Sequence, residues 1–316
     1  MIVVAGEALI DLVAEPDGRY RALPGGSPAN VAVGLARLGR PTEMLARISD
    51  SAFGRLIRDH LTGNGVGLRH AVTAAQPATL AVVTRPPGAE PHYDFYLDGT
   101  ADWAWTDGEI PSRLPEGTRA LCTGSLALAR SPGAEVLAGL LERVHGRVTT
   151  VVDPNIRPGV MDVGPAGRAR VEANVALADV VKVSAADLET IAPGEEPADV
   201  AKRWLSLGPR LVVVTRGAAG AYAVTSGGAQ VEAPGRPVDV VDTIGAGDAF
   251  TSGLVDALDR HGLLVDGARR IEAADRVTLR RIVDHAALVA ALTCTRPGAD
   301  PPDADAVVAA GAAEIR

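Results

Sequence analysis

The chain has 316 residues, of which 47% are hydrophobic and 3% aromatic, and its formal net charge is −8. This composition predicts a sizeable core packed by Ala, Val and Leu, in one large α/β domain or about two average ones. The sequence has no basic block to neutralise phosphates and no apolar run near the roughly 20 residues of a membrane helix, so neither a nucleic acid nor a membrane is an expected partner.

The N-terminal residues MIVVAGEALIDLV lack a basic leader and predict a buried strand rather than a signal peptide. The two cysteines, Cys122 and Cys294, show no pairing pattern, which favours a reducing compartment. We therefore expect a cytoplasmic protein.

Short apolar segments alternate with segments of helical periodicity along the chain. Because the apolar segments are nearly continuous, they predict strands that are buried on both faces. The expected strands are Ile2–Ala5, Arg119–Cys122, Val148–Val152, Val180–Val183 and Leu211–Thr215. The expected helices are Pro28–Leu38, Phe53–Asn64, Ala134–His145, Gly164–Ala178, Pro197–Leu207, Ala249–His261 and Leu279–Leu292. The alternation predicts an α/β fold with a central, mostly parallel sheet, helices on both faces and a ligand at the carboxyl ends of the strands.

Two stretches interrupt this alternation. Leu9–Leu23 predicts two strands around a Pro16-Asp17-Gly18 turn, and Thr79–Leu97 predicts two strands, LAVVTR and HYDFYL, around the turn-like PPGAEP. These strands predict a small β-sheet lid inserted in the main domain, which could keep water from reacting groups. Surface hairpins without a functional role are the alternative.

The chain therefore divides into two parts. Residues 1–8, 24–78 and 106–316 are predicted to form the α/β core that binds ligands, and residues 9–23 and 79–105 the β-sheet lid. An apolar lid could pair with the lid of another copy and so protect its edges, which predicts a homodimer.

Several polar and glycine residues stand where strands end. Asp11 could accept hydrogen bonds from two vicinal hydroxyls, with a surface turn as the alternative. Gly25 and Gly26 permit a hinge or a close backbone approach to a ligand, or only a strand-to-helix turn, and Asn30 follows in the first helical turn. Arg157 follows a buried strand and could neutralise phosphate, orient a sugar or form a structural salt bridge.

A glycine loop at Val240–Leu258 is the most informative segment. The sequence VVDTIGAGDAFTSGLVDAL places Gly245-Ala246-Gly247 at the start of a helix, where free amides and the helix dipole favour an anion. Asp248 follows, and it could cap the helix or also accept a proton from a hydroxyl. No GxxxxGK[ST] loop is present, so this glycine loop must hold the phosphates if the protein uses ATP.

The segment DTIGAGD, continued by AFTSGL, resembles the C-terminal motif of the PfkB family of ribokinase-like carbohydrate kinases. GGSPANVAVGLARLG at Gly25–Gly39 resembles the family's N-terminal motif. The segments GSLAL and DPNIRP resemble the fructokinase-like branch. The resemblance implies a ribokinase-like fold, ATP and Mg²⁺ as cofactors, Asp248 as the catalytic base, and the amides of Gly245, Ala246 and Gly247 as the anion hole.

The resemblance also implies two binding sites. The sugar site would contain Asp11, Gly26 and Asn30, together with the neighbouring Gly25 and with Arg157 of DPNIRP. Leu97 stands where fructokinase and 2-keto-3-deoxygluconate kinase relatives often carry Arg, which disfavours an acidic sugar and also weakens the case for fructose.

The nucleotide site would contain Lys182 of VKVSAADLET and the three matched residues of VVVTRGAAGAY, which are Thr215, Gly217 and Gly220. A β-hairpin without a binding role is the alternative for the second segment. Asp187 matches the residue that holds hydrated Mg²⁺ in relatives, although it is shorter than the usual Glu. Asp242 is a candidate for a K⁺ site.

These observations predict an ATP-dependent sugar kinase that phosphorylates a primary hydroxyl, with fructose as the first substrate choice. The alternatives are 2-keto-3-deoxygluconate, ribose, another ketose and a nucleoside. A dinucleotide-dependent oxidoreductase would require a GxGxxG loop after the first strand, and VVAGEALIDL lacks it. A catalytically silent sugar-binding regulatory protein would be expected to have lost the base, yet Asp248 is present.

Overall fold

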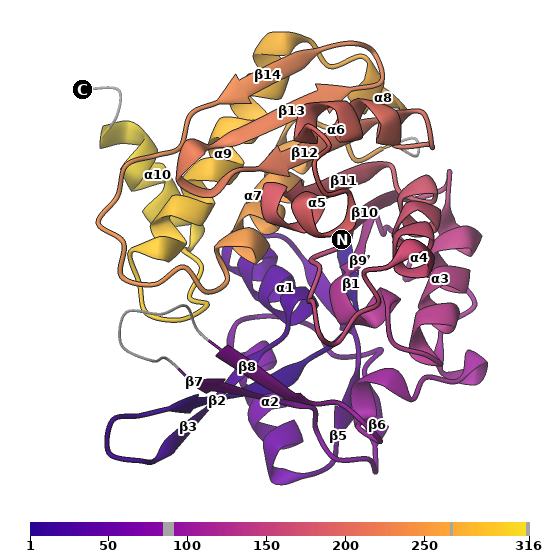
Figure 1. Cartoon of the computed structure of the whole chain (residues 1–316), viewed down its shortest axis with the longest axis vertical. Helices are drawn as coiled ribbons and strands as arrows, with labels where there is room; N and C mark the ends of the chain where they lie inside the picture. Colours follow the sequence, from indigo (N-terminus) through magenta and orange to yellow (C-terminus); the bar gives the residue numbers. More distant parts are fainter. Residues whose placement is uncertain (85–91, 266–267, 314–316) are drawn as a thin grey trace.

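The main sheet has eight strands, and the computed structural model describes it within residues 1–84, 92–265 and 268–313 (Figure 1). The spatial order is β14 (Gln230–Ala233), β13 (Ala221–Thr225), β12 (Leu211–Thr215), β11 (Val180–Ser184), β10 (Thr149–Asp153), β9 (Ala120–Gly124), β1 (Ile2–Ala5) and β4 (Thr42–Leu45). In this spatial order, the six strands from β12 to β4 run parallel to one another. Strand β13 is antiparallel to both of its neighbours. The predicted, mostly parallel sheet is therefore confirmed.

Helices cover both faces of this sheet, as the alternation of strand side chains requires. Ile2 and Val4 of β1 belong to one buried cluster, and Val3 and Ala5 to the other. The first cluster contains side chains of α1 (Ser27–Arg37), α2 (Ala52–Gly63), α7 (Ala246–Arg260) and α9 (Arg276–Cys294). The second contains side chains of α3 (Gly133–Val144), α4 (Pro165–Ala176), α5 (Ala185–Ile191) and α6 (Pro197–Leu205).

A separate four-stranded sheet, called the small sheet below, lies at the bottom of the view in Figure 1. Its order is β3 (Tyr20–Gly25), β2 (Leu9–Ala14), β7 (Leu80–Thr84) and β8 (His92–Tyr96). These are the four strands that the sequence predicts for the two interrupting stretches. The segment PPGAEP lies outside the described residues.

Strands β13 and β14 and helix α5 were not predicted from the sequence. The elements not yet described were not predicted either. They are β5 (Arg47–Ser49) paired with β6 (Val72–Ala74), helices α8 (Arg269–Glu272) and α10 (Ala304–Ala313), and the 3₁₀ turns η1 (Ala101–Trp103), η2 (Asp107–Glu109), η3 (Ser125–Leu128) and η4 (Gly217–Ala219). Strand β4, with the sequence TEML, was missed because Thr42 and Glu43 give no apolar run; both are nevertheless buried. Among the described residues, no helix combines the length and apolarity that a bilayer crossing needs.

Candidate active site

The glycine loop lies at the N-terminus of α7, as predicted. Gly245 caps the helix with φ of 75°, and a Cβ there would lie 2.6 Å from the Cβ of Ala299, so both conformation and space require glycine. Within the described residues the amides of Gly245, Gly247 and Asp248 have no hydrogen-bond acceptor, whereas the Ala246 amide donates to Thr243 O at 3.2 Å. The Ala246 amide was predicted to belong to the anion hole, and this prediction is wrong because Thr243 O already accepts its hydrogen. The free amides at this helix end are those of Gly245, Gly247 and Asp248, and the last of these was not predicted.

The Asp248 carboxylate is held by two side chains of the N-terminal motif. Ser27 Oγ donates to Oδ1 at 2.6 Å, and Asn30 Nδ2 donates to Oδ2 at 2.8 Å. Both donors belong to the first turn of α1, whose helix packs against α7. The fold therefore joins the two motifs through one carboxylate. Ser27 is a site residue that the sequence analysis missed, although it stands between Gly26 and Asn30.

Asp11 and Arg157 face the same region. Burial and the nearby Asp248 charge raise the pKa of Asp11 to about 6, while the Arg157 guanidinium opposes the shift. A Cβ on Gly25 would collide with Asp11 Oδ2, so Gly25 makes room for this carboxylate. At Gly26, φ is 101° and a Cβ would lie 2.8 Å from Glu7 O, so this glycine permits close passage of two chain segments.

Lys182, which was predicted for the nucleotide site, is enclosed by the protein. Its side chain is buried, and Nζ forms an ion pair with Asp153 Oδ2 at 2.7 Å. Although burial alone would lower the pKa of Lys182, the Asp153 carboxylate raises it above its ordinary value, so the ammonium stays charged. A Cβ built on Gly247 would lie 3.1 Å from Nζ. A fixed positive charge therefore lies beside the amides of the glycine loop.

Replacement of Gly247 by Val tests this close packing. The added side chain would contact the Lys182 ammonium and occupy the approach of an anion to the amides, so kcat is expected to fall about 100-fold, the usual effect of losing one such donor. Steady-state phosphorylation rates measure the loss. Gly139→Val in α3 is the control, because a Cβ there meets only the Arg143 guanidinium at 3.6 Å. Wild-type turnover in Gly247→Val would contradict an amide cradle.

The Asp187 carboxylate accepts hydrogen bonds from backbone amides and from Ser184, the residue that caps its own helix. Oδ2 accepts from Ser184 N at 3.1 Å and from Ser184 Oγ at 2.7 Å, and Oδ1 accepts from Ile156 N at 2.9 Å. These three donors use most of the lone pairs of the carboxylate, which is buried. Asp187 therefore joins α5 to the loop after β10 and fits poorly as a ligand for hydrated Mg²⁺.

The predicted nucleotide residues lie at the end of β12 and in the turn that leads to β13. Thr215 ends the strand, and Gly217 and Gly220 both have positive φ, of 55° and 94°. Strands β12 and β13 pair antiparallel, so this turn closes a β-hairpin, and its place in a nucleotide site stays a prediction. Asp242 Oδ1 accepts from Ile244 N at 3.1 Å and Oδ2 accepts from Gly298 N at 2.9 Å, which ties the glycine loop to the loop after α9.

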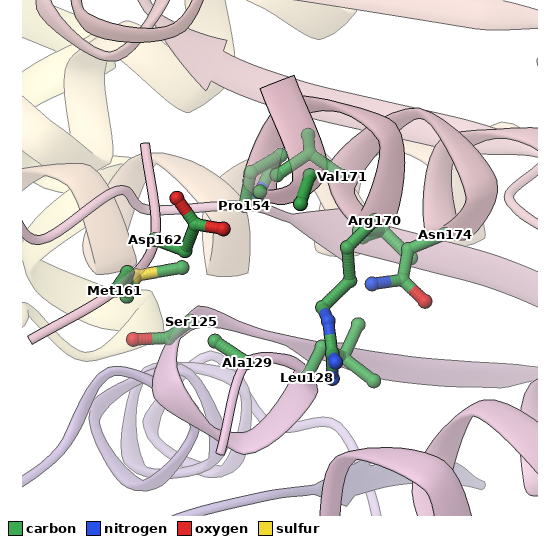
Figure 2. A pocket seen from close by; sticks show the side chains of 12 residues that line it. Ser125, Leu128, Ala129, Pro154, Met161, Asp162, Arg170, Val171 and Asn174 are labelled. Carbon is green, nitrogen blue, oxygen red and sulfur yellow. The ribbon is translucent and has the colours of Figure 1, made fainter. Parts of the chain in front are cut away.

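A cavity of about 150 Å³ lies beside the loop after β10, and Figure 2 shows Pro154, Met161 and Asp162 of that loop among its lining residues. Leu128, Val152, Met161 and Val171 contribute to its apolar wall, and Arg170 and Asn174 of α4 to its polar part. Because Val152 and Asp153 are successive strand residues, they point to opposite faces of the sheet. The cavity is therefore separate from the Asp248 region.

Comparison with known proteins agrees with this geometry. The model of the pfkB family of carbohydrate kinases matches residues 1–306. The chain belongs to this family. Its fold is accordingly the ribokinase-like fold expected from the sequence, and its class is that of ATP-dependent carbohydrate kinases.

Three relatives illustrate the similarity. A fructokinase from Rhizobium leguminosarum bv. trifolii is 34% identical over 89% of this chain and 86% of its own length. The ATP-bound fructokinase from Xylella fastidiosa superposes with a TM-score of 0.91 at 27% identity, covering 100% of this chain and 99% of the other. A fructokinase double mutant from Vibrio cholerae O395, with fructose, ADP and a potassium ion bound, gives a TM-score of 0.84 at 29% identity and covers 98% of both chains.

Proposed function

We propose that this kinase transfers the γ-phosphoryl group of ATP to a primary hydroxyl of fructose. The observation that carries the proposal is the Asp248 carboxylate, held by Ser27 and Asn30 at a helix N-terminus with free amides. Fructose is preferred over other sugars because relatives that are 31–35% identical over most of their length are named fructokinase or probable fructokinase.

In the proposed reaction Asp248 accepts the proton of the sugar hydroxyl as its oxygen attacks the γ-phosphorus, and the bond from phosphorus to the bridging oxygen of ADP breaks. The amides of Gly245 and Gly247 stabilise the negative charge of the transferred group. The Lys182 ammonium adds positive charge beside Gly247. Asp11 accepts hydrogen bonds from sugar hydroxyls, and Arg157 faces it.

Metal ions would be held mainly by the phosphates of the nucleotide. Mg²⁺ commonly binds proteins through one or two carboxylates and keeps several waters, and it supplies charge neutralisation to the phosphates. Since Asp187 has little remaining capacity, no step above depends on it. We also propose a K⁺ site near Asp242, supported by the potassium ion in the Vibrio cholerae relative. Turnover in potassium-free and potassium-containing buffer tests this site.

A coupled measurement of ADP release over ketoses, aldoses, sugar acids and nucleosides tests the substrate. We expect the highest kcat/KM with fructose. A higher value for a sugar acid or a nucleoside would replace fructose, and ADP release that no acceptor stimulates would remove the kinase proposal.

Sugar affinity is expected to depend on the protonation of Asp11. Its pKa is raised to about 6, so the group is largely neutral below that pH and accepts hydroxyl donors poorly. The Kd for fructose, measured by calorimetry without ATP, should therefore fall as the pH rises from 5 to 7. The Asp11→Asn variant should bind weakly with no such trend. An unchanged trend in Asp11→Asn would assign the titration to another group.

The small sheet is proposed to act as the lid, because its β2 strand carries Asp11 and its β3 strand ends at Gly25.

Tyr96 is 62% exposed and Tyr20 is 55% exposed, which supports the proposal that two small sheets pair in a homodimer. Sedimentation velocity would give the mass of the particle in solution and so test the homodimer.

Cys122 and Cys294 are both unpaired, which supports the proposal of a reducing, cytoplasmic location.

A further inference from the structure

One buried carboxylate connects the places where the chain passes between the core and the small sheet. Ala8 immediately precedes β2, Thr79 immediately precedes β7, and Asp102 lies in η1, after the chain has left β8. Asp102 Oδ1 accepts from Ala8 N at 2.8 Å, and Asp102 Oδ2 accepts from Thr79 Oγ1 at 2.5 Å. Three of the passages between the two parts therefore meet at one side chain, which is only 3% exposed.

Further hydrogen bonds extend this connection. Thr79 Oγ1 lies 2.6 Å from Thr100 Oγ1, and the single proton of Thr100 can go either to Thr79 Oγ1 or to Leu97 O, which lies 2.8 Å away. Ile10 N donates to Thr79 O at 3.0 Å, which joins the starts of β2 and β7 directly. Asp102 thus accepts from both Ala8 and Thr79 within a buried polar network, in which a lost bond leaves an unsatisfied group.

The fourth passage, from β3 into α1, lies against the first. Gly26 lies so close to Glu7 that a Cβ would be 2.8 Å from Glu7 O. Glu7 is 1% exposed, and its Oε2 accepts from Ala127 N at 3.1 Å, which anchors this segment to η3 of the core. Burial raises the pKa of Glu7 to about 8, so Glu7 is largely neutral at neutral pH. It is a second buried acid beside the hydrogen bonds of Asp102.

We propose that Asp102 is a positioning residue whose carboxylate clamps the base of the small sheet and thereby sets the place of Asp11 opposite Asp248. Asp11 lies three positions after Ala8 on the same chain segment, so release of the Ala8 amide would free the start of the strand that carries it. Asp102 contacts neither the sugar nor ATP in this scheme and acts through β2. The inference rests on the proposed function only where it concerns sugar binding.

Trp103 provides a spectroscopic signal at the same place. It is 4% exposed and packs in a cluster with Leu97, at the end of the small sheet, and Leu126 of η3. A change in the angle between the small sheet and the core would alter the surroundings of this indole. Its fluorescence should therefore respond to sugar in the wild type, and the response should be weakened when the clamp is lost.

Asp102→Asn and Thr79→Val each remove part of the clamp with little change of shape, and Asp94→Asn is the matched control. Asp94 lies on β8 in an exposed pair with His92, away from the base of the sheet. Amide hydrogen exchange at residues 8–10 and 79–81 is expected to accelerate about tenfold or more in both clamp variants, with the core strands unchanged. The control should exchange like the wild type.

The kinetic expectation separates positioning from chemistry. In both clamp variants the KM for the sugar should rise about tenfold while kcat stays within about threefold, since loss of binding that is equal in the ground state and the transition state raises KM alone. Wild-type exchange at residues 8–10 in Asp102→Asn, or equal acceleration in all core strands, would overturn the clamp. If sugar does not stimulate ADP release by the wild-type protein, the proposed function is wrong. The hydrogen-exchange result would still decide whether Asp102 holds the chain passages between the core and the small sheet.

Discussion

Asp248→Asn is expected to lower kcat by about 10³-fold, within the range contributed by a general base, while the Kd for the sugar changes little. The amide oxygen of Asn can still accept one hydrogen bond. The Asn side chain cannot, however, take up a proton from the attacking hydroxyl. Ser27 Oγ and Asn30 Nδ2 both donate to Asp248 in the wild type, so the NH₂ group of Asn would face one of these two donors. The hydroxyl therefore loses its base, whereas the remaining sugar contacts are kept.

Single-turnover kinetics and calorimetric sugar binding measure the two quantities separately. Asp199→Asn is a suitable control, because Asp199 is an exposed carboxylate in the first turn of α6 that pairs only loosely with Lys202 at 3.7 Å. Turnover near that of the wild type in Asp248→Asn would remove the base assignment. A loss of sugar binding equal to the loss of kcat would instead make Asp248 a binding residue.

Lys182→Met should both destabilise the protein and slow the reaction. The substitution leaves the Asp153 carboxylate buried without its partner at 2.7 Å, which typically costs about 3–5 kcal/mol. Burial already raises the pKa of Asp153, and the Lys182 charge is the main influence that opposes it. Loss of the ammonium beside Gly247 should also lower kcat about 100-fold, as removal of one charge-stabilising group does. Urea unfolding and turnover measure the two effects.

The double variant Lys182→Met with Asp153→Leu distinguishes these two roles. Replacing both charges by apolar side chains of similar volume is often close to neutral for stability, so the urea midpoint should recover most of the loss. Thr251 Oγ1, which also donates to Asp153 at 3.2 Å, keeps its bond to Gly247 O. Turnover should remain low. Recovery of turnover together with stability would show that Lys182 serves only the fold.

The local sequence contained enough information for most of the regular structure. Continuous runs such as Val180–Val183 and Leu211–Thr215 predict buried parallel strands because both of their faces must be covered. The helix after Gly245 follows from its apolar spacing. The short strand β4 and the turns η1 and η3 could not be predicted, because tertiary packing buries their polar residues and no local pattern records it.

The candidate site divides in the same way. Asp248, the glycine loop and Asn30 were recognisable from residue types and their order, because free amides at a helix start and a following carboxylate form a local arrangement. The role of Lys182 was only partly predicted, since its partner Asp153 lies on a neighbouring strand. Asp187 was predicted as a magnesium residue, yet its contacts with Ser184 and Ile156 show that the fold uses it to hold a loop.

The sequence by itself determined the family, the glycine loop at a helix start and the acid that follows it, because these depend on neighbouring residues and on the backbone they dictate. Only the tertiary structure decided which distant groups meet. It places Ser27 on Asp248, Asp153 on Lys182, and Asp102 on Ala8 and Thr79. The physical reason is that these hydrogen bonds join segments far apart in the chain, and their partners are set by packing of the whole sheet and its helices, which spacing along the sequence does not encode.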